Sequence, residues 1–133
     1  MPKSTTLPSA ERGMRQRAVA DARRALVLDA ARAAFFELGL ERASVREIAR
    51  RAGYTPGAIY SYFSSKEEMY GALLGESLER LNQAVAAARP GGPRRGEPVE
   101  AATLRSAANA FFGFYRENPR DLDLGFYLFQ GLQ

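Results

Sequence analysis

Apolar and polar residues recur along the chain with the period of an α-helix, first between residues 27 and 38. In this stretch the apolar positions fall at i, i+4, i+7, i+8 and i+11, which places them on one helix face. Gly39 follows directly and suits the end of a helix, because glycine adopts positive φ without strain. The pattern predicts an amphipathic helix that takes over near Asp21. Its apolar positions are Val27, Ala31, Ala34, Phe35 and Leu38.

Capping signals predict a second, short helix. Ser44 and Glu47 have the spacing of a capping box, in which the serine caps the helix and the carboxylate reaches back to the Ser44 amide. An apolar stripe of two turns follows, and Gly53 ends the helix. The stripe consists of Val45, Ile48, Ala49 and Ala52.

A third helix is predicted immediately afterwards. Thr55 lies two residues after Gly53 and can cap it, with Pro56 at the first helical position, where the missing N–H costs nothing. Ile59 and Phe63 are spaced i, i+4 and are expected to face the core.

A longer fourth helix begins where Ser65 and Glu68 repeat the capping-box spacing, and we expect it to last until about Ala88. Segment 89–98 holds three prolines and three glycines and is predicted to be a loop. The apolar stripe of this fourth helix is Leu74, Leu78, Leu81 and Val85.

Another helix follows the loop, and Asn118-Pro119 separates it from a last short helix. Strand-like alternation is missing from the sequence, so the predicted fold class is all-α. The inward side of the fifth helix is expected to carry Leu104, Ala108, Phe111, Phe112 and Tyr115, and the last helix carries Phe126, Tyr127 and Phe129.

Charge divides the chain into two parts. Before Glu67 lie 12 of the 19 basic residues but only 6 of the 15 acidic ones, whereas the remainder is mildly acidic. A basic first half suggests that this part faces a polyanion, although a solubilising surface gives the same pattern. We predict a flexible basic arm over residues 1–18, a first helical domain over 19–66 and a second helical domain over 67–133.

The chain contains no Cys and no His. This removes disulfides, zinc sites built on thiolate or imidazole, and the nucleophile–base pairs that use either residue. Asp121 and Asp123 could ligate a metal, but two such carboxylates are more often solvated. We therefore expect no cofactor, no metal and no enzymatic activity.

Apolar runs are too short for a membrane helix, which needs about 20 residues, and the N-terminus lacks the apolar segment of a secretory signal. The expected location is cytoplasmic, with no membrane contact.

Two short helices joined by a tight turn, with a longer helix before them, are typical of a tri-helical helix-turn-helix unit. Packing of Ile59 and Phe63 against the first helix would hold the third helix rigid, so that its outward side could enter a DNA major groove. The outward residues are Thr55, Gly57, Ala58, Tyr60, Ser61 and Tyr62.

Residues 28–74 closely resemble the DNA-binding domain of TetR-family regulators, with correct spacing over about 50 contiguous residues. The resemblance implies that the domain over 19–66 binds DNA and that the helical domain over 67–133 is regulatory. The matching positions are Ala30-Ala31, Phe35, Gly39, Ser44 to Ala49, Ala52-Gly53, Gly57, Ile59-Tyr60, Tyr62-Phe63 and Ser65 to Glu67.

The resemblance implies a homodimeric repressor in the bacterial cytoplasm, associated with the nucleoid. It would bind a near-palindromic operator in double-stranded DNA and would leave it when a small-molecule inducer binds the helical C-terminal domain. Carried over by position, phosphate contacts fall on Ser44, Arg46, Tyr60, Tyr62 and Lys66, and base-proximal positions fall on Thr55, Pro56, Gly57, Ala58 and Ser61.

One departure from the family concerns the base-reading surface. Position 56 is often polar or basic in the family, and here it is proline. The third helix therefore has no Arg, Lys, Asn or Gln for bidentate base readout, which favours apolar contacts, backbone, water or DNA shape as the source of specificity.

Aromatic residues crowd the last quarter of the chain, where the family would place its ligand pocket. For any single ring, ordinary core is the alternative. The residues assigned to ligand binding on this basis are Phe111, Phe112, Tyr115 and Phe126.

Three further readings stay open. The basic residues Arg12, Arg15, Arg17, Arg23 and Arg24 could reach the DNA minor groove, although a solvated tail with a nonspecific electrostatic benefit is the more common arrangement. The chain stops at Gln133, just after this aromatic segment, and family members run well beyond that length, so we expect a part of a longer protein that exposes apolar surface and associates. The alternative function is a helical protein-interaction module that kept the scaffold without specific DNA readout.

Overall fold

The computed structural model of the chain describes residues 8–88 and 91–130 and divides it into two compact units, with the boundary between Met69 and Tyr70. Regular structure in the described residues is helical throughout, so the all-α prediction is confirmed. The helices are α1 (Ser9–Leu38), α2 (Val45–Ala52), α3 (Pro56–Tyr60), α4 (Lys66–Ala87), α5 (Val99–Glu117) and α6 (Pro119–Gln130).

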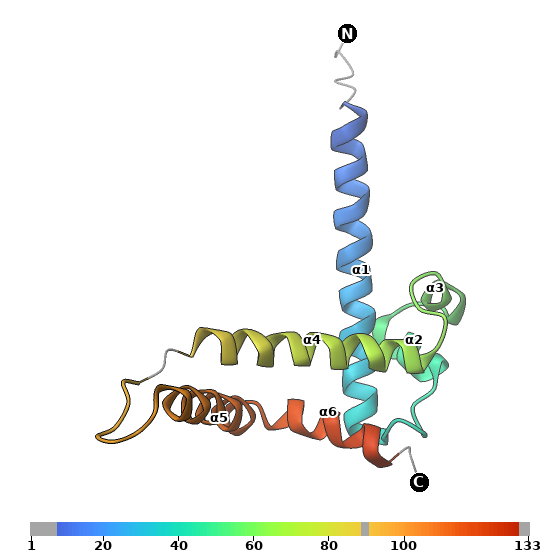
Figure 1. The fold of residues 1–133 in the computed structure, drawn as a ribbon. Coiled ribbons are helices and arrows are strands. Elements are labelled where there is room, and N and C mark those ends of the chain that lie inside the picture. The colour runs from blue at the N-terminus through green and yellow to red at the C-terminus, as the bar shows by residue number, and fades with distance from the viewer. Residues whose placement is uncertain (1–7, 89–90, 131–133) are drawn as a thin grey trace. The chain divides into compact units, whose positions relative to one another are not determined.

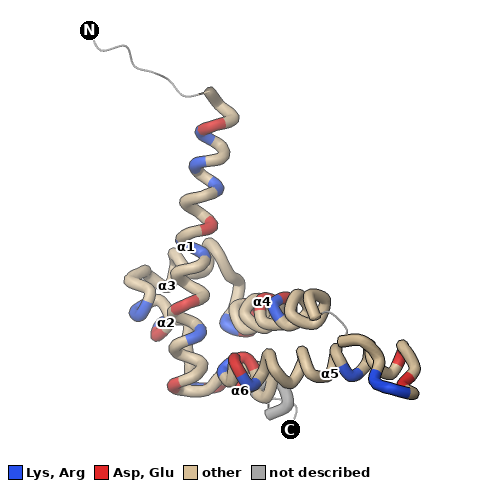
Figure 2. Tube along the Cα trace, turned by 90° about the vertical axis from the view of Figure 1, so that its left-hand side faces the viewer, with Lys and Arg blue, Asp and Glu red and all other residues tan. Residues whose placement is uncertain are grey.

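Helix α1 begins at Ser9, so the expectation of a flexible arm is wrong for residues 9–18, while residues 1–7 lie outside the described part. Apolar periodicity is missing from these residues because this end of α1 is exposed at almost every position. Strong helix formers (Ala, Arg, Glu, Gln and Met) fill the segment instead, and Pro8 precedes the first turn. The early part of α1 extends beyond α2 and α3 in both views of the chain (Figures 1 and 2).

The core of the first unit lies where α1 packs against α2, and α2 against α3. Apolar side chains from all three helices meet there with almost no exposed surface. This packing fixes α3 to α2, and through α2 to α1, and leaves the other side of α3 open. The buried residues are Val27, Leu28, Ala31, Ala34, Phe35, Ala43, Ile48, Ala49, Ile59, Phe63 and Met69.

The second unit contains most of α4 together with α5 and α6. The Tyr70 hydroxyl donates to the Leu124 carbonyl, and Arg80 forms an ion pair with Asp121, so that α4 and α6 lie side by side (Figure 1). The loop before α5 is tied by a salt bridge between Arg105 and Glu97 at 2.8 Å.

The predicted inward face of α5 is wrong. Leu104 is 72% exposed and Phe112 69% exposed, whereas Ala102 and Phe114 are buried. The stripe of α4 is likewise displaced, since Leu73 and Ser77 are buried and Leu78 is exposed. Both helices carry apolar residues on more than one side, so periodicity alone could not choose the buried side.

Among the described residues, none of the helices combines the length and the apolar character that crossing a membrane requires.

Candidate nucleic-acid interface

Helix α3 is short, capped and anchored from one side. The Thr55 hydroxyl accepts a hydrogen bond from the Ala58 amide at 3.2 Å, and Pro56 occupies the first turn, as the sequence predicts. Ile59 and Phe63 are buried, while Tyr60 is 56% exposed. The predicted base-proximal residues line the open side of the segment: Thr55, Pro56, Gly57 and Ser61 are exposed, and Ala58 is half-buried.

The turn before α3 follows the predicted geometry. Gly53 has φ 75° and ψ 27°, the left-handed conformation that favours glycine, and its amide donates to the carbonyls of Ala49 and Arg50. This tight reversal sets the direction in which α3 leaves α2.

At the start of α2, Ser44 accepts a hydrogen bond from the Glu47 amide at 3.1 Å, which confirms the predicted cap. The second half of the capping box is wrong: the Glu47 carboxylate instead accepts from Arg50 at 2.6 Å and from Arg51 at 2.9 Å. Two guanidinium groups compete successfully for this carboxylate because charge-assisted bonds are the stronger ones. They lower the pKa of Glu47 from 4.5 to about 2.

This ion-pair cluster leaves one basic residue of α2 available. Arg51 also pairs with Glu37 of α1 at 2.8 Å, so Arg50 and Arg51 are both neutralised within the domain. Arg46 is exposed and has no ion-pair partner among the described residues. It is therefore the α2 cation best placed for an external anion.

The ammonium group of Lys66 lies on backbone carbonyls of the turn between α1 and α2. It donates to Leu40 at 2.7 Å, to Glu41 at 3.0 Å and to Ala43 at 3.1 Å. These three bonds use all three of its N–H groups. Lys66 therefore stabilises the turn before α2, a role that the spacing of residues in the sequence could not reveal.

Four of the five predicted phosphate-contacting residues come together. Ser44, Arg46, Tyr60 and Lys66 line one open hollow of about 460 Å³, which also borders the start of α4. Glu41 and Glu67 also line it. Hydroxyl, guanidinium and phenol groups from the start of α2 and from α3 thus share a surface that can donate to phosphate oxygens.

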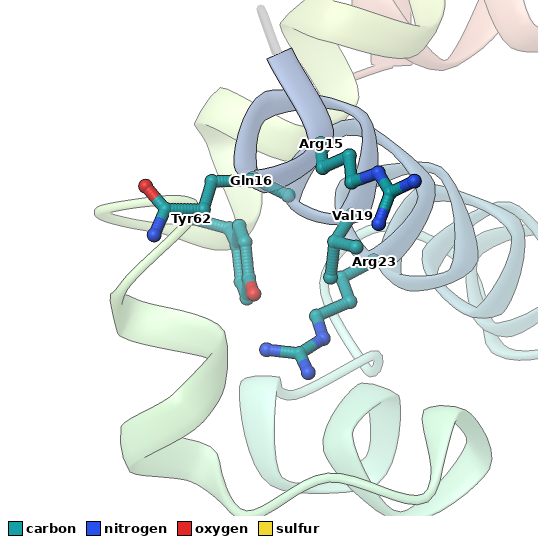
Figure 3. A pocket seen from close by; sticks show the side chains of 6 residues that line it. Arg15, Gln16, Val19, Arg23 and Tyr62 are labelled. Atoms are coloured by element: carbon teal, nitrogen blue, oxygen red, sulfur yellow. The ribbon is translucent and has the colours of Figure 1, made fainter. Parts of the chain in front are cut away.

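Tyr62, the fifth, lies elsewhere. Its side chain lines a second hollow of about 310 Å³ whose other wall is α1, and Figure 3 shows its ring facing the side of α1 that bears Val19 and Arg23. Arg15 and Arg23 of α1 belong to this surface, whereas the sequence suggested either a solvated tail or an arm that reaches the minor groove. Helix propensity across residues 9–24 is the signal that would have placed them on a rigid element.

In the second unit, three of the four aromatic residues assigned to ligand binding lie together on α5. The Phe111 ring meets Phe112 at 5.5 Å and Tyr115 at 5.0 Å between ring centroids, both edge to face. Phe126 lies on α6 and is 55% exposed.

Known proteins share these features. The family model described as bacterial regulatory proteins, tetR family, matches residues 27–73, which run from the core of α1 into α4. An HTH-type transcriptional repressor of Mycobacterium tuberculosis is 40% identical over 70 residues, which cover 53% of this chain and 36% of the relative. The HTH-type transcriptional activator FasR of Mycolicibacterium smegmatis is 35% identical over 106 residues, covering 80% of this chain and 46% of that protein.

Among solved structures, a TetR-like transcriptional regulator from Rhodococcus is 29% identical with a TM-score of 0.59, over 77% of this chain and 53% of that one. The chain spans less than half the length of the two curated relatives. All three proteins are named as transcriptional regulators, in keeping with the expectation of a non-enzymatic function. The helix-turn-helix domain of the chain, residues 27–73, belongs to the TetR family of bacterial regulatory proteins.

Proposed function

We propose that the chain is a DNA-binding transcriptional regulator, and specifically a repressor that leaves its operator when a small molecule binds. The observation that carries the proposal is the presentation of α3: Ile59 and Phe63 anchor it in the core, and its open side stands beside a donor-lined hollow. The M. tuberculosis relative is named as a repressor, which supports this mode, whereas FasR is named as an activator.

In the proposed complex, α3 enters the major groove. Gly57 lets the backbone approach the base edges, and the Ala58 methyl group contacts a thymine methyl. Phosphates on the groove wall are bound by Ser44, Arg46 and Tyr60 from the larger hollow. Tyr62 provides a further hydroxyl, while Lys66 acts by holding the turn that leads into α2.

Specificity in this proposal comes from shape as much as from base contacts. The open side of the segment from Thr55 to Ser61 has neither charged nor amide side chains, so the bidentate pairs that discriminate bases most strongly are not formed there. Sequence-dependent groove width and deformability then carry part of the preference.

Two copies of the chain would bind the two halves of a near-palindromic operator, since a two-fold dimer matches a two-fold site. The proposed inducer is a small apolar or aromatic molecule, because the residues assigned to it are aromatic. These residues are Phe111, Phe112, Tyr115 and Phe126.

The test begins with selection of bound duplexes from a random DNA pool by the protein. We expect enrichment of a near-palindromic sequence and an affinity that falls steeply with salt. The variant Arg46→Gln should lower the slope of log K against log salt by about 0.9 per copy, the value for one phosphate contact. Arg95→Gln, in the loop of the second unit, removes the same charge and should leave the slope unchanged.

A protein that binds no duplex in a salt-dependent way would contradict the proposal and would favour an interaction module instead. Repression and activation are then separated by in vitro transcription from a promoter that carries the selected duplex. A repressor lowers the transcript yield, and its inducer restores it.

A further inference from the structure

We propose that the first half of α1 and Tyr62 form a second surface that binds DNA phosphates, beside α3. The inference rests on the proposed DNA-binding function and adds a separate set of contacts to it. We call this surface the α1 basic face, formed by Arg12, Arg15, Val19 and Arg23 of α1.

Helical geometry gathers these residues on one side. They follow each other at i, i+3, i+7 and i+11, the spacing of a single helix face. Asp21 lies on the opposite side of the helix, since it is two residues from both Val19 and Arg23 and each step turns by about 100°. Figure 2 shows Lys and Arg outnumbering Asp and Glu along this part of α1.

These guanidinium groups are free to bind an external anion. Arg12, Arg15 and Arg23 are exposed, and within residues 8–88 and 91–130 none of them has an ion-pair partner. Other arginines in the chain behave differently: Arg51 and Arg105 each pair with a carboxylate at 2.8–2.9 Å. Among the described residues, the arginines of the α1 basic face therefore form no ion pair that would stabilise their own domain.

Two observations place the α1 basic face beside the segment that follows α3. Arg24 lies over the ring of buried Phe63 at 4.8 Å from the ring centroid, which holds α1 against the segment that follows α3. Tyr62, next to Phe63, lines the hollow of about 310 Å³ together with Arg15 and Arg23 (Figure 3).

The chemistry of this hollow fits a nucleic-acid backbone. Arg15 and Arg23 offer planar forks that match phosphate oxygens, and the Tyr62 phenol adds another donor. Val19 and Ala20 add apolar lining against which a deoxyribose can pack. Tyr60 lines the larger hollow and Tyr62 this one, so the segment leaving α3 touches both surfaces.

The occupant we assign is therefore the phosphate backbone of the duplex that α3 reads, at phosphates outside those bound by Ser44 and Arg46. Such contacts are independent of sequence, so they raise affinity for every duplex without altering base preference.

The experiment compares two double variants of the full chain with equal net charge. Arg15→Gln/Arg23→Gln removes two of the three arginines of the α1 basic face. Arg17→Gln/Arg95→Gln removes one exposed arginine from the opposite side of α1 and one from the loop before α5. Glutamine keeps helix propensity, and circular dichroism verifies that both proteins remain folded. Binding to a mixed-sequence duplex of about 30 base pairs is measured between about 50 and 200 mM salt.

We expect the first variant to lower the slope of log K against log salt by about 1.8 per bound copy, the value for two phosphates. Its affinity deficit relative to the unsubstituted chain then shrinks about tenfold across this salt range. The matched variant should keep the original slope, and Arg15→Lys/Arg23→Lys should keep it as well.

An unchanged slope in the first variant, or an equal fall in the matched one, would overturn the inference while leaving the proposed function intact. Failure of the unsubstituted chain to bind any duplex would instead overturn the proposed function.

Discussion

At the scale of single residues, Lys66 joins two parts of the chain that are more than twenty positions apart. Its ammonium group satisfies three carbonyls of the turn between α1 and α2, and two of these bonds are partly buried. Hydrogen bonds to a charged donor contribute more than neutral ones, so this single side chain stabilises the position of α2.

The variant Lys66→Met tests this role. We expect the free energy of unfolding of the first unit to fall by about 1–3 kcal/mol, because the carbonyls lose a charged donor. The salt slope of DNA binding should stay as it is, since the ammonium group contacts protein. Arg46→Gln is the control with the opposite pattern: a slope lower by about 0.9 and almost unchanged stability. A lower slope in Lys66→Met would show that Lys66 binds phosphate.

Glu47 makes the stability of the first unit depend on pH. Arg50 and Arg51 lower its folded-state pKa from 4.5 to about 2, so the folded chain holds the charged form more strongly than the unfolded chain does. This contribution is complete above pH 4.5 and is lost as the pH falls toward 2. Glu47→Gln should therefore flatten the pH dependence of unfolding in that window, measured by amide exchange in α2.

A matched variant lies in the second unit. The side chain of Arg105 and the amide of Arg94 lower the pKa of Glu97 to about 2 in the same way. Glu97→Gln should flatten the pH dependence of amide exchange in α5 and leave the pH dependence in α2 unchanged. Equal effects of both variants on α2 would contradict the assignment to Glu47.

Residue-level features were predictable from the sequence where they are local. The contacts of Gly53, Thr55 and Pro56 reach only three or four positions along the chain. Each of these residues has the capping or turn conformation that the neighbouring sequence predicts. The partners of Glu47 and Lys66 were missed for two reasons. Glu47 has arginines within one helical turn that outcompete an amide, and Lys66 reaches carbonyls from 23 to 26 positions away.

At the scale of helices, α1 consists of a buried half and an exposed half with different origins. From Val27 onward its apolar side chains meet the core, whereas its first turns depend on intrinsic propensity. The spacing of apolar residues predicted the buried half, because packing against a core imposes helical periodicity. The exposed half has no such periodicity, so the same pattern could not predict it.

Gly13 is the weak point of that exposed half. An added Cβ would meet nothing within 4 Å, so Gly13→Ala should stabilise the local helix by about 0.5–1 kcal/mol and slow amide exchange over residues 9–20. Gly53→Ala is the matched opposite: it has equal space, but its φ of 75° is strained for alanine, so the first unit should lose stability. Faster exchange in Gly13→Ala would show that these turns are not helical in solution.

At the scale of the whole molecule, the second unit exposes more apolar surface than a solvated helix needs. Leu104 and Phe112 on α5 are each about 70% exposed, and Leu122 and Phe126 add to them on α6. Large exposed apolar groups of this kind favour association. We therefore expect this chain to self-associate in sedimentation experiments.

The double variant Leu104→Gln/Phe112→Gln should raise the monomer fraction at equal concentration, and Met14→Gln, which removes an exposed apolar residue of α1, should not. A chain that sediments as a monomer before any substitution would contradict this expectation.

The length of α3 limits how much information a single copy can read. Five residues at about 1.5 Å each span roughly two base-pair steps of about 3.4 Å. Two or three base pairs carry on the order of 4–6 bits of information. A sequence that short occurs by chance many times among the roughly 10⁶ competing sites of a genome. A genomic search for its targets therefore needs two half-sites at a fixed spacing, with variation allowed in the flanking sequence. A search with one short sequence would return mostly chance matches.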